Sequence, residues 1–272
     1  MRNDNLKKMQ FPEQQHTAPQ PGYSLPTDFV ELPSKGRFYS EDHPLHNKED
    51  VEVTFMTTKE EDILTSPAYN KKGVVFDKLI ESVLVDKRIK SNTLLLGDKS
   101  AIIINARKNA YGSNYNIGVE CDQCFHQNET TVDLEKVTIK KNEIGGVDFT
   151  DRGTFILTLP KTEAVVEVKL LTSEDEVEIT KKAEQKSKHH LPESPATDRL
   201  RQMILTVNGN SDMLVVSSFI TTLPIADSRY VKKIHNEITP DIDFSYKLDC
   251  EECGATCEGG VPILGTFFWP DE

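Results

Sequence analysis

The sequence predicts an α+β fold built from two related strand-helix-helix halves, joined through a four-cysteine site that resembles a zinc ribbon and preceded by a flexible N-terminal arm. Two CxxC pairs, CDQC at 121–124 and CEEC at 250–253, each close one stretch of the chain. Short segments of the first stretch recur in the same order in the second. The start of the chain is polar and has few branched apolar residues, so it cannot bury enough surface to offset its ordering entropy.

Composition limits the classes of partner. The chain has 272 residues, enough for one large domain or two ordinary ones, and a formal net charge of -12. This charge disfavours nonspecific attraction to nucleic acid or to an anionic membrane, which are themselves negative. No stretch reaches the roughly 18 apolar residues of a membrane helix, and the N-terminus lacks the apolar core of a signal peptide, so we expect a cytoplasmic protein.

Residues 1–27 form the predicted arm, and residues 28–141 form the first half. LPSKGRFY (32–39) is predicted to be an ordered turn between apolar anchors. In VEVTFMTTKEE (51–61), alternating apolar residues predict a half-buried strand, and Thr57 or Thr58 can cap a helix whose first turn is acidic. DKLIESVLV (77–85) has apolar residues at helical spacing.

Residues 142–165 are assigned to linking strands, including the strand TFILTLP, and residues 166–272 to the second half. VEVKLLTSEDE begins at Val166 and matches VEVTFMTTKEE at an offset of 115, with five identities in eleven positions. DRLRQMILT (198–206) matches DKLIESVLV. The changing offset requires insertions, part of which we place in the polar segment 181–196. Chance likeness between amphipathic segments is the alternative to a duplication.

The last match includes the cysteines. Asp98, Cys121, Cys124 and Val132 lie over Asp227, Cys250, Cys253 and Val261, all at an offset of 129. Each CxxC lies between two strand-like segments, and two such knuckles provide the four thiolates of a tetrahedral zinc site with no open position for water. We therefore expect Zn²⁺ in a structural role, with Cys121, Cys124, Cys250 and Cys253 as ligands. Gly254 suits the positive φ of such a turn.

The sequence allows three alternatives to this zinc site. His126 and Cys257 could substitute as ligands, but neither has a counterpart in the other half. The cysteines could be reduced, metal-free thiols. Redox chemistry requires an activated thiolate at a helix start, whereas both pairs follow strand-like residues and the preceding acids, Glu120 and Asp249, are expected to raise the thiol pKa.

The sequence contains no motif for an enzyme site. It lacks a GxxxxGK[ST] loop, a GxGxxG turn, HExxH and GxSxG, so we predict no catalytic residues and no small-molecule substrate. The pair His189-His190 and the histidines of SEDHPLHNKED (40–50) are assigned to surface segments. The basic and aromatic clusters at 107–112 and 229–233 are interpreted as exposed helix faces or partner contacts, in preference to nucleic-acid contacts.

Phe267, Phe268 and Trp269 gather three aromatic side chains at the end of the chain, and Trp269 is its only tryptophan. Aromatic residues this close together either pack on the core of their own chain or anchor another subunit. Both interpretations are open, and these three residues are candidate partner-binding residues.

ELPSKGRFY, together with the ending from CEECG to FFWP, resembles the baseplate hub and hub-assembly proteins of T-even-like contractile-tailed bacteriophages. The resemblance covers about residue 25 to the C-terminus. It implies a virion morphogenesis protein that binds other phage baseplate hub or tail proteins and no membrane. Its location would be the infected host cytoplasm during assembly, or the tail baseplate of the virion. The alternative function is a zinc-ribbon nucleic-acid-binding module in the phage or host cytoplasm.

Overall fold

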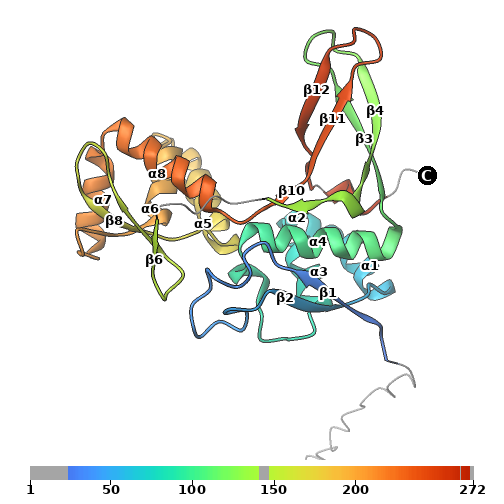
Figure 1. Cartoon of the computed structure of the whole chain (residues 1–272), viewed down its shortest axis with the longest axis horizontal. Coiled ribbons are helices and arrows are strands. Elements are labelled where there is room, and N and C mark those ends of the chain that lie inside the picture. Colours follow the sequence, from blue (N-terminus) through green and yellow to red (C-terminus); the bar gives the residue numbers. More distant parts are fainter. Residues whose placement is uncertain (1–23, 141–146, 264, 270–272) are drawn as a thin grey trace, which may run out of the picture.

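The structure, a computed structural model, describes residues 24–140, 147–263 and 265–269, and its chain forms two lobes and an upright pair of hairpins (Figure 1). The predicted mixed α+β architecture is confirmed. Of the predicted arm, residues 1–23 lie outside the described residues, while Thr27 already begins a strand.

The first lobe comprises the strands and helices that precede the first hairpin. Its elements are β1 (Thr27–Glu31), β2 (Asp50–Thr54), α1 (Thr58–Thr65), α2 (Pro67–Lys72), α3 (Val75–Val83), the 3-10 turn η1 (Ser91–Thr93) and α4 (Leu96–Tyr111).

The second lobe lies between the two hairpins in the sequence. Its elements are β6 (Asp148–Phe149), β7 (Phe155–Thr158), β8 (Val165–Val168), α5 (Ser173–Lys188), α6 (Pro195–Met203), β9 (Ile204–Val207), α7 (Met213–Thr222) and α8 (Ile225–Ile238).

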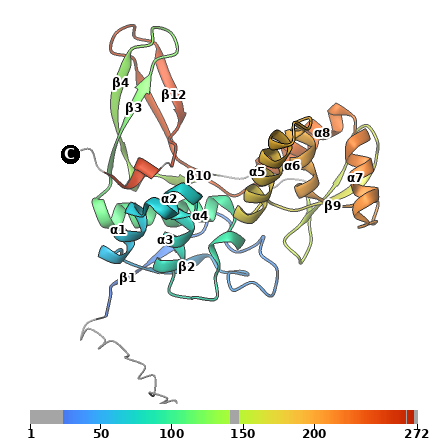
Figure 2. The same ribbon diagram turned by 180° about the vertical axis from the view of Figure 1, so that it is seen from behind.

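The two hairpins stand side by side above α4, and we call them the tower (Figures 1 and 2). One is β3 (Asn114–Glu120) with β4 (Gln127–Asp133), and the other is β11 (Ser245–Asp249) with β12 (Thr256–Gly260). Near the base of the tower lie η2 (Leu134–Lys136), β5 (Thr138–Ile139), β10 (Ile242–Asp243) and η3 (Gly265–Phe268), and β5 pairs with β10.

The first helix of each lobe begins with the same local device. Thr57 and Thr172 are the N-caps of α1 and α5, and each forms a capping box with the acid three residues later, Glu60 or Asp175. A capping box satisfies backbone N–H groups that have no partner within the first helical turn, and the acid also interacts favourably with the helix dipole. Thr57, one of the two predicted caps, is confirmed as the N-cap of α1, and Thr172 has the equivalent role in the second lobe.

Each lobe contains an antiparallel strand pair, and the two pairs align equivalent residues. β1 pairs with β2, and β7 pairs with β8, with Val30 opposite Val51 and Leu157 opposite Val166. On its other side, β2 forms a single antiparallel bridge, between Val53 and Leu84. At the equivalent side of the second sheet, β8 pairs with the strand β9. β6 extends the second sheet on its other side, giving the order β6-β7-β8-β9. The strand predicted in TFILTLP is therefore confirmed as β7, a member of the second lobe's sheet.

β1 and β7 each run into a Leu-Pro turn that is held by a buried aspartate. After β1, Asp98 on α4 accepts hydrogen bonds from the backbone N–H of Ser34, from its hydroxyl and from the Tyr39 hydroxyl, at 2.9, 2.6 and 2.7 Å. After β7, Asp227 on α8 accepts bonds from the N–H groups of Lys161 and Thr162 and from the Thr162 hydroxyl, at 2.8, 2.9 and 2.8 Å.

The helices show where the second lobe is longer. α3 and α6 have nine residues each, and their first residues lie 120 positions apart. The sequence match of Asp77 with Asp198 has an offset of 121, so the helix starts differ from that match by one residue. Part of the extra length extends α5 through the first half of the predicted insertion segment, to Lys188. The remainder forms α7. In chain order, α7 precedes the last helix of the second lobe, as the short η1 precedes α4 in the first.

One apolar core extends through both lobes, and its members include Leu79 and Ile102 in the first lobe and Phe155 and Val166 in the second. The lobes also meet through their backbones, because the N–H of Ser173 donates to the carbonyl of Leu94 at 3.0 Å. Among the described residues, no helix is both long and apolar enough to cross a membrane.

Candidate metal centre

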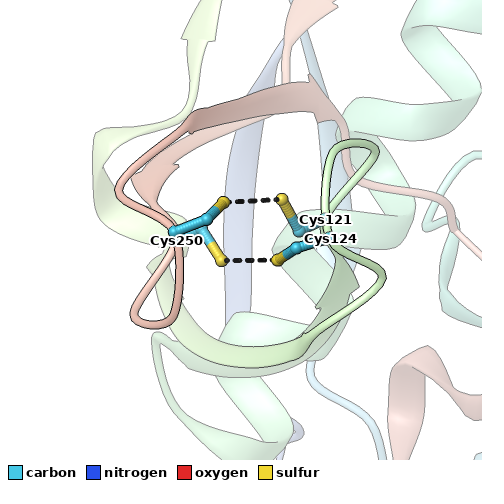
Figure 3. Close-up of side chains that lie close together, drawn as sticks. Cys121, Cys124 and Cys250 are labelled. Carbon is cyan, nitrogen blue, oxygen red and sulfur yellow. Dashed lines mark hydrogen bonds between the residues drawn. The ribbon is translucent and has the colours of Figure 1, made fainter.

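The centre lies where the turns of the two tower hairpins face each other (Figure 3). In each turn, the first cysteine closes the hairpin by donating its N–H to a carbonyl five residues later. Cys121 donates to His126 at 2.9 Å, and Cys250 donates to Ala255 at 2.8 Å. The two knuckles are thus closed by equivalent bonds at residues 129 positions apart.

The residue after each second cysteine has a positive φ, 59° at Phe125 and 71° at Gly254. This conformation lets the N–H of Phe125 and of Gly254 donate back to the carbonyl of the first cysteine, at 2.8 and 2.9 Å. The positive φ predicted for Gly254 is confirmed. Glycine adopts this conformation freely, whereas a phenylalanine at positive φ is a strained position.

The structure brings Cys121, Cys124, Cys250 and Cys253 together. Their four sulfur atoms all lie within 4.8 Å of one another. Sγ of Cys121 lies 3.7 Å from Sγ of Cys253, and Sγ of Cys124 lies 3.6 Å from Sγ of Cys250. A disulfide would require about 2.05 Å, so these are free thiols.

The spacing fits a tetrahedral metal site. Four zinc–sulfur bonds of about 2.3 Å place neighbouring sulfurs about 3.8 Å apart, close to the two shortest separations observed here. The residues present therefore fit a divalent cation held by four thiolates. Such a donor set selects zinc or another soft metal over calcium or magnesium, which prefer oxygen ligands.

The knuckle backbone favours the thiolate form of the first cysteine in each pair. N–H groups of Cys124 and Gln123 point at Cys121 and lower its pKa to about 6. The N–H of Cys253 similarly lowers the pKa of Cys250. The expectation that these pKa values are raised is wrong, because the N–H groups of the knuckle backbone lower them.

Cys124 titrates in the opposite direction. The N–H of His126 lowers its pKa, but burial and the neighbouring thiols together raise the pKa to about 12. Four sulfurs this close cannot all be ionised without a compensating positive charge. A bound divalent cation supplies that charge, which makes ligand deprotonation and metal binding interdependent.

Asn128 connects the two hairpins beside the sulfurs, and no motif in the sequence indicates this role. Its side chain is buried, and its Oδ1 accepts a 3.0 Å hydrogen bond from the N–H of Glu251 inside the other knuckle. Its Nδ2 donates to the carbonyls of Val119 and His126 within its own hairpin. Polar residues that orient metal ligands in this way strengthen metal sites.

The two alternative ligands lie outside the group of four sulfurs. Burial first, and then the Cys121 side chain, raise the pKa of Cys257 to about 11. His126 contributes its backbone carbonyl to the knuckle. Neither side chain belongs to the cluster.

The aromatic tail divides between core and surface. Phe267 and Phe268 are fully buried, with ring centroids 5.6 Å apart in an edge-to-face arrangement. Phe267 also packs edge-on against Tyr115 of β3 and Phe244. Trp269 is 37% exposed. Of the three candidate partner-binding residues, only Trp269 is accessible in this structure.

Arg107 fastens this tail to the first lobe. It is fully buried, and its Nε donates to the carbonyl of Phe267 at 2.9 Å while Nη1 donates to the carbonyl of Gly112 at 3.1 Å. Its guanidinium also lies over the Tyr111 ring, 5.1 Å from the centroid. The interpretation of the cluster at 107–112 as an exposed helix face is therefore wrong for Arg107, and this residue cannot contribute to a nucleic-acid surface.

The remaining histidine candidates serve as structural or surface groups. His43 stacks on Tyr39 with ring centroids 4.3 Å apart and is within 2.9 Å of the Thr93 hydroxyl. His46 contacts the carbonyl of Tyr39 at 2.7 Å. His189 and His190 are exposed at the end of α5, as predicted. Among the residues described by the structure, the four cysteines are the only candidate metal-binding cluster.

Comparison with known proteins gives one family. The family model described as T4 bacteriophage base plate protein matches residues 28–269, nearly the whole described chain. No curated protein and no solved structure matches the chain.

Proposed function

Since the chain belongs to the T4 bacteriophage base plate protein family, we propose that it is a structural or assembly component of the baseplate hub. Family membership makes it a phage baseplate protein and associates it with the virion tail. The finer role proposed is docking with other hub or tail proteins during hub construction, with no bond made or broken. Assembly would take place in the infected host cytoplasm.

A structural zinc ion is part of this proposal. We assign Cys121, Cys124, Cys250 and Cys253 as its ligands, because their sulfurs meet at the spacing of a tetrahedral site. One hairpin precedes the second lobe in the sequence and the other follows it. The ion would therefore hold the two ends of that lobe close together. A closed four-thiolate site has no position for substrate, which suits a structural ion.

The two lobes are proposed to be related halves of one duplicated unit. Equivalent capping boxes, strand registers, aspartate-held turns and knuckles support the duplication. The first half would cover 28–141. The second would begin at β6 rather than at residue 166, because β6 and β7 belong to its sheet. Two halves fixed by a metal form a rigid platform for docking.

Trp269 is the proposed aromatic anchor for a partner. It directly follows the buried Phe268 and is held by a 3.0 Å hydrogen bond from its N–H to the carbonyl of Thr266. A partly exposed tryptophan on a backbone fixed by its buried neighbours offers a large contact area at low entropic cost.

Reconstitution with the other hub proteins of the same phage tests the docking role. We expect the wild-type chain to co-elute with them, and Trp269→Ala to weaken the complex while the melting temperature of the free protein stays unchanged. Leu191→Ala, at another exposed apolar residue, is the matched control. Intact complexes combined with a destabilised free Trp269→Ala protein would show that the tail belongs to the core and is not an anchor.

A further inference from the structure

The outer edge of β1 has no partner strand among the described residues. β1 belongs to a two-stranded sheet with β2 alone. The N–H of Leu32 donates to Glu49 and the carbonyl of Pro26 accepts from Phe55, so the even-numbered residues of this stretch bond to β2. In an antiparallel ladder the residues between them direct their N–H and C=O groups the other way. Thr27, Phe29 and Glu31 therefore present backbone groups outward.

A side chain takes the place of a strand at this edge. The N–H of Phe29 donates to Oδ1 of the adjacent Asp28 at 2.9 Å. The other carboxylate oxygen of Asp28 accepts from the side chains of Asn105 and Asn109 on α4. The Asp28 carboxylate thus covers one outward donor while it remains attached to α4.

The second lobe shows what this edge lacks. β7 precedes a Leu-Pro turn as β1 does, and its outer edge is covered by β6, with Asp148 opposite Ile156 and Phe149 opposite Phe155. Because Val30 and Leu157 occupy equivalent positions in their strand pairs, Phe29 in β1 corresponds to Ile156 in β7. Phe29 is 62% exposed. A strand therefore lies on β7 at the place where β1 is open.

A groove runs along the open edge of β1. It has a volume of about 440 Å³. Residues of β1, of α4, of the segment from η2 to β5 and of β10 line it. Apolar side chains contribute much of its lining, and they include Ala101, Ile104, Val137 and Ile139.

The exposed face of the β1–β2 sheet is acidic around Phe29. Phe29 lies opposite Glu52, and Glu31 lies opposite Asp50, so these four side chains share one face. An added strand would direct alternate side chains toward the apolar groove and toward these acids. The complementary segment is extended and alternates apolar with basic residues.

We propose that the edge of β1 accepts an extended segment of another baseplate protein, with alternating apolar and basic side chains, as an additional strand. This inference rests on the proposed docking function and specifies one of its surfaces. β-Strand addition gains affinity from backbone hydrogen bonds and specificity from alternate side chains.

The chain itself favours a strand from elsewhere. β6 reaches β7 through a reversal at residues 150–154, where the N–H of Thr150 donates to the carbonyl of Thr154. No such reversal directly precedes β1. The carbonyl of Pro26 still accepts a hydrogen bond from the N–H of Phe55, so the chain just before β1 continues the pairing with β2. A segment from another protein would supply the first lobe with the strand that β6 supplies to the second.

The test uses the full chain and a fluorescein-labelled ten-residue peptide of alternating valine and lysine. We expect saturable binding by anisotropy, together with slower hydrogen exchange at Thr27, Phe29 and Glu31. The same peptide with N-methyl groups on its ladder-facing amides should bind at least tenfold more weakly. Equal binding of both peptides, no binding at all, or protection only elsewhere on the chain would overturn the proposal.

Charge reversal provides the matched variants. Glu31→Lys and Glu52→Lys should each weaken peptide binding about tenfold at low salt, whereas Glu193→Lys, in the exposed loop before α6, should leave it unchanged. Unchanged binding by both edge variants would contradict the proposed site. A chain without residues 1–23 shows whether the N-terminal segment competes: binding that appears only after its removal would make that segment the occupant and overturn the partner assignment.

Reconstitution of the hub complex separates this inference from the proposed function. Weakened complexes with Glu31→Lys, and intact ones with Glu193→Lys, are expected. If both variants form normal complexes, the edge inference fails and the docking function stands. If the wild-type chain forms no complex with the hub proteins, the docking function fails, and the peptide experiment alone decides whether the edge accepts a strand.

Discussion

Asp98 and Asp227, 129 residues apart, hold equivalent turns in the two lobes. Each is fully buried on the helix that leads toward a tower hairpin, and each accepts three hydrogen bonds from the turn region that follows a Leu-Pro pair. The same helix therefore fixes the turn after β1 or β7 and directs the chain toward the cysteine knuckle. The position of the metal centre depends on this connection.

Removing either carboxylate should destabilise the protein to a similar extent. Asp98→Ala and Asp227→Ala each remove a fully buried carboxylate that accepts three hydrogen bonds, at a cost on the order of 3 kcal/mol in the free energy of unfolding. Urea denaturation measures the change, with the exposed Asp151→Ala as the control. A loss in one variant and none in the other would contradict the equivalent roles.

Arg107→Met should loosen the C-terminal tail. The substitution keeps an apolar stem but removes the donors to the carbonyls of Phe267 and Gly112, which we expect to lower the free energy of unfolding by about 2–3 kcal/mol. Faster hydrogen exchange in residues 265–269 would accompany the loss. Lys108→Met, next along the helix and in a 3.4 Å surface pair with Glu135, should change stability by less than about 1 kcal/mol. Equal effects of the two variants would refute the tail-fastening role.

His235 should make stability fall as the solution becomes acidic. Burial, followed by the positive charge of Arg199, lowers the pKa of this histidine to about 4, whereas its ordinary value is 6.5. The unfolded chain therefore binds more protons in this window, and stability is lost as pH falls from about 6.5 toward 4. The loss between pH 7 and pH 5 is about 2 kcal/mol.

The comparison of variants isolates this histidine from the carboxylates. His235→Phe should reduce the loss of stability between pH 7 and pH 5 by about that amount, whereas His189→Phe, at an exposed position, should reproduce the wild-type pH dependence. Parallel pH profiles for wild type and His235→Phe would rule out the buried neutral histidine as the cause.

Asn128→Ala should weaken metal retention without unfolding the tower. The substitution removes the acceptor of the 3.0 Å hydrogen bond that the backbone N–H of Glu251, in the opposite knuckle, donates to Asn128. We expect zinc affinity to fall about tenfold in competition with a chromogenic chelator. Asn116→Ala, which removes an exposed contact with Thr131 in the same hairpin, is the control. Identical zinc affinities in all three proteins would argue against the bridging role.

The sequence predicted the features that depend on local spacing. The capping threonines, the CxxC hairpins and the positive φ of Gly254 each follow from a few neighbouring residues. The meeting of the four sulfurs was also predicted, because each pair is one half of a site that is complete only with the other. These features need little information about long-range packing.

Features set by packing were missed or displaced. LPSKG and LPKTE share only a leucine and a proline at matching positions, and the bonds to Asp98 and Asp227 that relate them are visible only in three dimensions. Arg107 looked like a surface cation because its carbonyl partner Phe267 is 160 residues away. The prediction assigns β7 to a linker, whereas β7 pairs with β6 before it and with β8 after it, and the sequence does not show which strands will pair.

Metal content measured by native mass spectrometry tests the central claim most directly. The account predicts one zinc ion per freshly reduced wild-type chain, lost together with thermal stability in Cys124→Ser/Cys250→Ser and retained in Cys257→Ser. A reduced wild-type chain that takes up no metal from added zinc, or a double variant that keeps its zinc and its melting temperature, would contradict a structural ion held between the two hairpins.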